Sequence, residues 1–260
     1  MHKLEKIVQL LPSIKNYVEE IVRDTKINQQ NIYPCLKAYV FNSFMLYTAS
    51  CIRHNRDIDL SKYSSRVRKS LSKVSRIRYL ANLCRLYLKL TSKRRNIIAD
   101  IGCGLGLNLN ISRNYGLLSS FLVGIDKDLY FLKILKKLLN HVEVIHADAL
   151  MLPIRTSSID IVFSTGLVHE LPSLRAIDEF KRILRRNGYL LLTDIVFRFI
   201  PSQILNLIRN IRIRIRSEPE TPYTLKQIIT KIKSLNMIIE ESITFWKLIA
   251  GAMAIIAKKR

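Results

Sequence analysis

Three glycines and three aspartates are spaced in this sequence as a nucleotide-binding site requires. The stretch "DIGCGLG" places Gly102, Gly104 and Gly106 directly after an apolar run. Glycines in a turn between a strand and a helix leave backbone N–H groups open to a ligand. The loop alone is a weak signal, because ordinary tight turns also use glycine.

Two of the aspartates strengthen that signal. Asp126 ends the next apolar run, 20 residues after Gly106, where a carboxylate can accept hydrogen bonds from both hydroxyls of a ribose. Asp148 follows the third apolar run, and the small neighbours Ala147 and Ala149 leave room for an adenine ring. The two acids together predict an adenosine site.

The third aspartate selects among adenosine ligands. Asp100 immediately precedes the glycine loop, where its charge would repel the pyrophosphate of a dinucleotide. A ligand with an ammonium group and a sulfonium would be attracted there. The sequence therefore predicts S-adenosylmethionine as the ligand and disfavours a nicotinamide oxidoreductase.

Short apolar runs alternating with helical stretches predict a parallel α/β sheet around this loop. Residues 1–95 contain only helical periodicity, whereas the chain ends in two consecutive strands that must pair antiparallel. The predicted strands are 96–101, 120–126, 142–146, 159–164, 189–194, 237–246 and 248–259. The predicted helices are 4–24, 33–52, 67–90, 105–115, 129–140, 173–186 and 224–236, and residues 201–216 fit either a helix or a strand.

With these elements placed, the chain resembles the class I S-adenosylmethionine-dependent methyltransferases, and among them the type 11 methyltransferase domain. "DIGCGLG" is similar to the family's glycine loop and "VGIDKD" to its acidic second-strand motif. "DALMLPIRTSSIDIVFS" and "EFKRILRRNGYLLL" resemble its later motifs. The resemblance covers 96–196 and the terminal hairpin, so we divide the chain into a basic helical extension at 1–95 and a methyltransferase domain at 96–260.

The resemblance implies a Rossmann-like, seven-stranded α/β sheet with helices on both faces and an antiparallel last strand. It assigns the methionine amine to Asp100, the ribose to Asp126, the adenine to Asp148, and the methionine and methyl side to Ser164 and Thr165. The cofactor-binding residues expected on this basis are Asp100, Gly102, Cys103, Gly104, Gly106, Asp126, Lys127, Asp148, Ala149, Ser164 and Thr165.

His169, just past the fourth strand, is the candidate catalytic base. Methyl transfer from a sulfonium is an in-line displacement that chiefly needs alignment, so a base is required only for acceptors that must lose a proton. Glu170 is the neighbour that we expect to orient the ring. The alternative interpretation is that His169 only packs at the mouth of the pocket.

The four cysteines predict neither a metal site nor a disulfide framework, because no CxxC pair or histidine partner occurs at ligand spacing. This pattern fits a reducing cytoplasm. No apolar stretch is long enough to predict a transmembrane span, and the N-terminus lacks the features of a secretory signal.

The net charge of +23 is concentrated outside the predicted site, since residues 1–95 carry +14, 96–196 carry +1 and 197–260 carry +8. Three functional interpretations remain open. The first is a small-molecule or lipid-like (quinone-like) acceptor, with 1–95 as a lid and peripheral contact of 201–216 with an anionic membrane. The second is RNA, bound by the basic residues of 61–99 with Tyr63, Tyr79 and Tyr87 stacking on bases. The third is a non-catalytic, cofactor-binding regulator.

Overall fold

The computed structural model describes residues 2–25, 33–91, 97–114, 121–198, 221, 223–247 and 250–260. Four helices come first: α1 (His2–Asp24), α2 (Tyr33–Arg53), α3 (Leu60–Leu71) and α4 (Val74–Thr91). The strands are β1 (Ile97–Ile101), β2 (Phe121–Asp126), β3 (Glu143–His146), β4 (Ile159–Thr165), β5 (Leu184–Phe197), β6 (Met237–Lys247) and β7 (Ala250–Lys259). The remaining helices are α5 (Leu107–Asn114), α6 (Leu129–Leu138), the short 3₁₀ helix η2 (Val168–Glu170), α7 (Ala176–Ile183) and α9 (Leu225–Ser234).

The strands form one seven-stranded sheet in the order β3-β2-β1-β4-β5-β7-β6. Strands β1 to β5 pair in parallel, and β7 runs antiparallel to both of its neighbours, β5 and β6. This is the predicted fold class, with the predicted antiparallel last strand. Because β1 and β4 are central, their carboxyl ends meet in the middle of one sheet edge, where α/β folds bind ligands.

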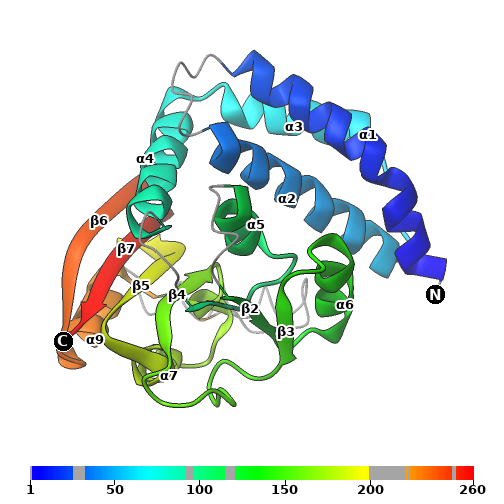
Figure 1. Ribbon diagram of the computed structural model, residues 1–260. Helices are drawn as coiled ribbons and strands as arrows, with labels where there is room; N and C mark the ends of the chain where they lie inside the picture. Colours follow the sequence, from blue (N-terminus) through cyan, green and yellow to red (C-terminus); the bar gives the residue numbers. More distant parts are fainter. Residues whose placement is uncertain are drawn as a thin grey trace.

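Helices cover both faces of the sheet (Figure 1). On one face, side chains of α7 and α9 such as Phe180 and Ile232 form a buried cluster with the strands. On the other face, α4, α5 and α6 form a second cluster that includes Tyr87 and Phe163. Helix α4 thus packs on the sheet itself.

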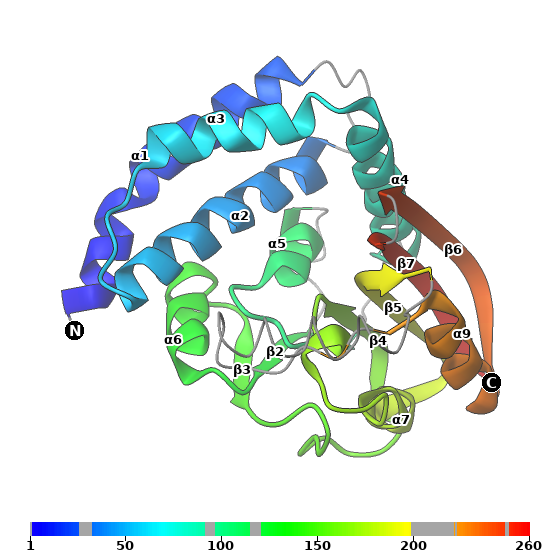
Figure 2. The ribbon, with the colours of Figure 1, turned by 180° about the vertical axis from the view of Figure 1, so that it is seen from behind.

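Helices α1, α2 and α3 form a further layer outside α5 and α6 (Figure 2). Their apolar side chains build a third buried cluster around Phe44, and Leu105 of the glycine loop and Ile134 of α6 belong to it. The outer layer is therefore anchored to the glycine loop by apolar burial.

Two predicted helices differ from the structure. The predicted helix 67–90 is interrupted after Leu71, because α3 packs on α1 whereas α4 turns to pack on the sheet at β6. The predicted helix 173–186 ends at Ile183, because Leu184 is extended and pairs with Ile159 of β4. The predicted element at 201–216, with its proposed membrane contact, lies outside the described residues.

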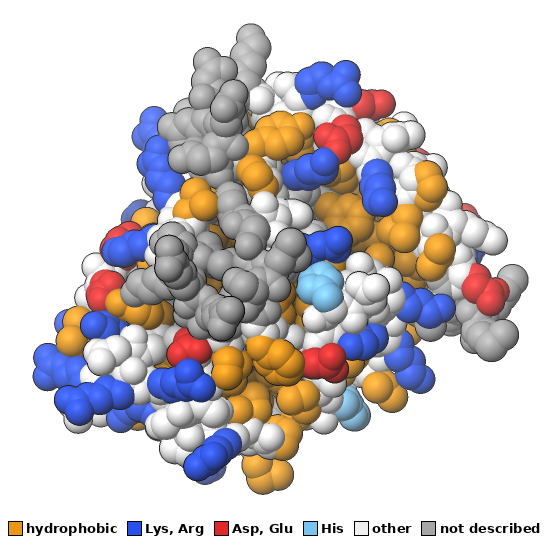
Figure 3. Space-filling view, in the orientation of Figure 1, with side chains coloured by type: hydrophobic (Ala, Val, Ile, Leu, Met, Phe, Trp, Pro, Cys, Tyr) orange, Lys and Arg blue, Asp and Glu red, His pale blue; other side chains and the backbone are white. Residues whose placement is uncertain are grey.

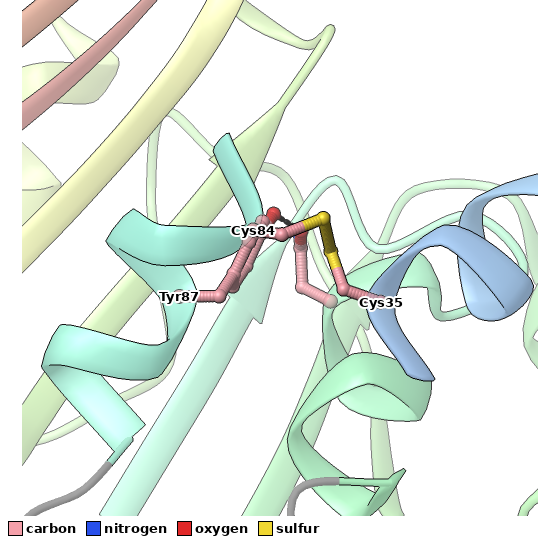
Figure 4. Close-up of a disulfide and its surroundings, with 4 residues drawn as sticks. Cys35, Cys84 and Tyr87 are labelled. Atoms are coloured by element: carbon pink, nitrogen blue, oxygen red, sulfur yellow. Dashed lines mark hydrogen bonds between the residues drawn. A yellow bond between two sulfur atoms is a disulfide. The ribbon is translucent and has the colours of Figure 1, made fainter. Parts of the chain in front are cut away.

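The expectation that no disulfide forms is wrong for Cys35 and Cys84. These two residues form a disulfide between α2 and α4, with Cα atoms 5.7 Å apart (Figure 4). Their separation of 49 residues carries no recognisable spacing, because packing of the helices brings them together. Cys51 and Cys103 are buried free thiols. The cysteine-based argument for a reducing cytoplasm therefore no longer holds.

This disulfide leads to a stability prediction. Closing a loop of 49 residues in the unfolded chain stabilises the fold by roughly 4 kcal/mol on the chain-entropy account. Reductant should therefore lower the thermal unfolding midpoint of the wild-type protein. The Cys35→Ser variant should already have the lower midpoint and show no further change with reductant. Equal midpoints for oxidised and reduced wild-type protein would contradict the bond.

Candidate active site

The three glycines of the loop all adopt left-handed backbone angles, with φ of +68°, +49° and +77° at Gly102, Gly104 and Gly106. The N–H groups of Gly102 and Cys103 donate to the carbonyl of Ile125, which fixes the loop against β2. A Cβ on Gly104 would meet nothing within 4 Å, whereas one on Gly106 would collide with Leu135. Gly104 therefore leaves space for a ligand, and Gly106 allows the close packing of α6.

Asp126 ties the glycine loop to the next strand end. Its Oδ2 accepts a hydrogen bond from the Gly104 N–H at 2.8 Å, and its Oδ1 accepts one from the Asp128 N–H at 2.8 Å. Asp148 follows β3, is exposed, and accepts a hydrogen bond from the Leu150 N–H. Both carboxylates line one cavity, so the two predicted adenosine-binding acids lie on the same wall.

That cavity has a volume of 720 Å³, within the range of about 300–1,000 Å³ typical of small-molecule sites. Predicted cofactor residues on its wall are Gly102, Cys103, Gly104, Asp126, Lys127, Asp148, Ala149 and Thr165. Asp100, Gly106 and Ser164 are buried and are not among the residues that line it.

Helix α2 forms the opposite wall of the cavity, which the sequence did not reveal. Tyr39, Asn42, Ser43 and Leu46 follow one another at helical spacing along this wall, and Arg53 and His54 extend it. Arg53 forms an ion pair with Asp128, next to Asp126. A largely apolar helix such as α2 resembles an ordinary core helix, so periodicity alone could not assign it to a site.

Asp100 is completely buried at the end of β1 and belongs to a polar cluster. The amide Nδ2 of Asn108 donates to its Oδ1 at 2.6 Å, whereas Asp100 Oδ2 has no hydrogen-bond partner among the residues that the structure describes. Burial raises the pKa of the Asp100 carboxyl to about 8, the Asn108 hydrogen bond lowers it, and the charge of Asp126 raises it further. Asn108 itself lines the cavity and donates to Asp100, so it connects this carboxyl group to the ligand space.

The remaining predicted residues near the loop lie in environments that suit a structural role. Burial raises the pKa of the Cys103 thiol well above its ordinary value, so this thiol is not poised as a nucleophile. Ser164 is fully buried in β4, and its hydroxyl has no hydrogen-bond partner in the described part of the chain. His146 ends β3, and its Nε2 lies 2.9 Å from the carbonyl oxygen of Lys127.

His169 lies in η2 beside a buried carboxylate. Its Nδ1 is 2.6 Å from Oδ1 of Asp194, whose side chain is inaccessible to solvent. The backbone N–H groups of Val168 and His169 donate to the other oxygen of Asp194. We expected Glu170 to orient the ring, and the structure provides Asp194 of β5 instead. An acid inside an otherwise apolar strand, as in "LLLTDIVF", was the overlooked sequence signal.

His169 adjoins the cavity rather than lining it. Its Cε1 is 3.9 Å from where a Cβ on Gly166 would lie, and Gly166 is part of the cavity wall. Within the described ranges no group of acids, cysteines and histidines could hold a metal ion. None of the described helices is long and apolar enough to span a membrane.

Comparison with known proteins identifies a methyltransferase domain in this chain. Residues 99–192 match the family described as a methyltransferase domain. The chain is 29% identical over 141 residues to an uncharacterized protein of Methanocaldococcus jannaschii, an alignment covering 54% of this chain and 53% of that protein. It is 31% identical over 120 residues to a ubiquinone/menaquinone biosynthesis C-methyltransferase of Campylobacter jejuni, covering 44% of this chain and 51% of the relative. The chain thus spans about half the length of these relatives.

A solved structure with the same fold is geranyl diphosphate C-methyltransferase from Streptomyces coelicolor. The two superpose with a TM-score of 0.58 at 11% identity, covering 70% of this chain and 77% of that one. The fold and the family match together define a class I methyltransferase domain. The match is confined to residues 99–192, so it identifies a methyltransferase domain within this chain.

The residues present fit the cofactor that this family uses. The space above Gly104 would be filled by any side chain, the buried Asp100 Oδ2 lacks a partner among the described residues, and the carboxylates of Asp126 and Asp148 line the cavity. Such a wall suits a ligand that is cationic at one end and carries a ribose and an adenine at the other.

The burial of Asp100 leads to a pH-dependent prediction. Between about pH 4 and pH 8 the folded chain keeps a proton on Asp100 that the unfolded chain releases, so this residue destabilises the fold progressively as the pH rises through that window. Asp100→Asn should therefore be more stable than wild type, by on the order of 3 kcal/mol at pH 7 and much less at pH 4. Urea unfolding of both proteins at several pH values measures the difference.

The same Asp100→Asn variant should bind S-adenosylhomocysteine about tenfold more weakly or worse, because the amide cannot balance the ligand's ammonium charge. A variant that is destabilised at every pH would contradict the raised pKa. A variant with wild-type affinity would contradict the assignment of Asp100 to the cofactor.

Proposed function

We propose that this protein transfers a methyl group from S-adenosylmethionine to a small, largely apolar acceptor held beneath α2. The observation that carries the proposal is the single 720 Å³ cavity, which joins the glycine loop and both adenosine acids to a wall supplied by α2. A cavity closed on its outer side by a helix admits a small molecule more readily than a folded polymer.

The cofactor would lie along the strand ends. Asp126 would accept the ribose hydroxyls, Asp148 would accept the adenine amine beside Ala149, and Lys127 would border the adenosine. The main chain at Gly102, Cys103 and Gly104 would contact the ligand where side chains are absent or small. Thr165, Asn108 and the buried Asp100 define the methionine end, as the hydrogen bond between Asn108 and Asp100 supports.

The acceptor would occupy the space between the glycine loop and α2. Its apolar boundary consists of Leu46, Leu105, Leu107, Phe131, Leu167 and Leu171, and polar groups of Tyr39, Asn42 and Ser43 interrupt it. Such a wall recognises an apolar body with a few polar groups. The C. jejuni relative acts in ubiquinone/menaquinone biosynthesis, which supports a quinone-like acceptor here.

The three tyrosines that the RNA alternative assigns to base stacking make contacts within the protein instead. Tyr87 is buried, and the hydroxyl of Tyr79 donates to the carbonyl of Met253. Tyr63 stacks on Tyr47 with ring centroids 4.2 Å apart, and its hydroxyl donates to the Ser43 carbonyl. These rings are engaged within the protein, so the proposed alternation of cations and stacking platforms is absent from the described part of 61–99.

Two of the basic residues of 61–99 also form ion pairs within the protein. Arg68 is paired with Glu20 and Asp24, and Lys89 is paired with Glu241. On the face shown in Figure 3, Lys and Arg side chains alternate with apolar and acidic ones. A dispersed pattern of this kind is typical of a solvated surface.

The residues of this chain act mainly by alignment. S-adenosylmethionine, when bound, supplies an electrophilic methyl group on a sulfonium. Residues of the glycine loop and α2 would hold the acceptor in line with it and exclude water. Where the acceptor must lose a proton, His169 is the candidate base, and Asp194 would hold the Nδ1 tautomer and stabilise the imidazolium.

Asp126 provides the first test of the cofactor site. Asp126→Ala removes the acceptor of the ribose hydroxyls and the anchor of the Gly104 N–H, so affinity for S-adenosylhomocysteine should fall at least about tenfold. Circular dichroism should show that the variant remains folded. Unchanged affinity, measured by calorimetry, would overturn the site assignment.

The acceptor is tested by methyl transfer. Labelled S-adenosylmethionine and the protein are incubated with an extract of the source cells, which is then separated into organic-soluble, small polar, protein and RNA pools. We expect label in the organic-soluble pool. Label in nuclease-sensitive material would establish the RNA alternative, and no label despite cofactor binding would favour the non-catalytic regulator.

The same assay examines His169. His169→Gln should lower turnover at least about tenfold without changing affinity for S-adenosylhomocysteine, if proton removal accompanies transfer. Equal turnover in variant and wild type would assign His169 to packing alone.

A further inference from the structure

Helix α4 inserts one tyrosine into the polar cluster at the proposed cofactor site. Tyr87 is 1% exposed, and its hydroxyl donates to Oδ1 of Asn108. It follows Cys84 by one helical turn, so the disulfide to α2 lies beside it. A buried tyrosine hydroxyl needs a hydrogen-bond partner, and the partner here is Asn108, a residue that lines the cavity.

The hydrogen bonds around Asn108 determine which way its amide faces. Its Oδ1 accepts from Tyr87 and also from Thr165 Oγ1 at 3.1 Å, and Thr193 in turn donates to Thr165 at 2.7 Å. With the amide oxygen facing two hydroxyl donors, the Nδ2 group faces Asp100 and donates to it at 2.6 Å. A flipped amide would set two oxygens against each other, carbonyl against carboxylate.

We propose that Tyr87 is a positioning residue of the cofactor site. By fixing the amide of Asn108, it keeps a donor on Asp100 and so holds that carboxylate ready for the ammonium group of the ligand. The N-terminal helices then contribute to the subsite for the methionine part of the ligand and do not merely cover it. This inference rests on the proposed use of S-adenosylmethionine.

The electrostatic surroundings of Asp100 support this role. The groups that face it are Asn108 from α5, Asp126 from β2, Cys103 from the glycine loop and Tyr87 from α4. Among them Asn108 favours the ionised carboxylate, whereas the charge of Asp126 opposes ionisation. Loss of the Tyr87 hydroxyl should loosen the Asn108 amide and raise the pKa of Asp100 further.

The test compares Tyr87→Phe with Tyr79→Phe. Tyr79 lies on the same helix, and its hydroxyl donates to a backbone carbonyl outside the cluster, so it controls for general damage to α4. Calorimetry would measure the affinity of the full chain for S-adenosylhomocysteine and for methylthioadenosine, which lacks the amino acid. We expect Tyr87→Phe to bind S-adenosylhomocysteine roughly fivefold more weakly at pH 7, with methylthioadenosine and Tyr79→Phe unaffected.

The pH dependence separates positioning from mere packing. The ligand's amine titrates in the same way in every assay, so its effect cancels in the ratio of wild-type to variant affinity. Any change of that ratio with pH therefore comes from titration of the protein. We expect that ratio to be larger at pH 7 than at pH 9, because the higher pH ionises a larger share of Asp100 in both proteins and narrows the difference between them. An equal loss for both ligands, or a ratio independent of pH, would overturn the proposal.

Binding by the wild-type protein and by a Thr193→Val variant distinguishes failure of this inference from failure of the proposed function or of folding. Failure of the wild-type protein to bind S-adenosylhomocysteine would overturn the proposed function itself, whereas normal wild-type binding with an unchanged Tyr87→Phe would overturn only this inference. If Tyr87→Phe does not fold, Thr193→Val removes the outermost hydroxyl of the same chain of hydrogen bonds. It should produce a smaller loss of the same pH dependence, and no loss would count against the role of the cluster.

Discussion

The structure depends on a carboxyl group buried in the centre of its sheet. Asp100 lies in β1 between β2 and β4, opposite Gly124 and Phe163, and no solvent reaches it. A carboxylate in such a place is strongly disfavoured unless hydrogen bonds or a cation accompany it. One of its oxygens accepts a hydrogen bond from Asn108 and the other has no partner within the described ranges, so these residues supply half of the compensation. The site is therefore incomplete in a way that a cationic ligand would complete.

This constraint explains why the N-terminal helices and the sheet form one unit. The amide that serves Asp100 is fixed from α4 through Tyr87, and a disulfide connects α4 to α2. Helix α2 then supplies the outer wall of the cavity, and Leu105 joins its apolar cluster to the glycine loop. Displacing either helix would expose the cavity and disturb the cluster around Asp100 together.

Local pattern sufficed to predict the sheet and the loop. Apolar runs bounded by turns predicted where the strands lie. The positions of Asp126 and Asp148 at the ends of successive strands led to the prediction that both acids share one site, and both line the cavity. Contacts between distant segments left no such pattern. The disulfide, the α2 wall and the pairing of His169 with Asp194 all depend on packing across 25 residues or more. The break between α3 and α4 has the same origin, since each helix follows a different partner.

The protonation of Asp100 couples stability to ligand binding. Near neutral pH the buried carboxyl holds a proton in the free protein, which relieves the cost of its burial. Binding a cation at this position favours the carboxylate, so the proton must leave as the ligand enters. The fold is thus more stable when Asp100 is neutral, whereas a cationic ligand would bind better when Asp100 is charged. Hydrogen bonding from Asn108 reduces the free-energy difference between these two protonation states. The hydroxyl groups of Tyr87, Thr165 and Thr193 keep that difference small, because they orient the amide of Asn108 without adding another charge to the core.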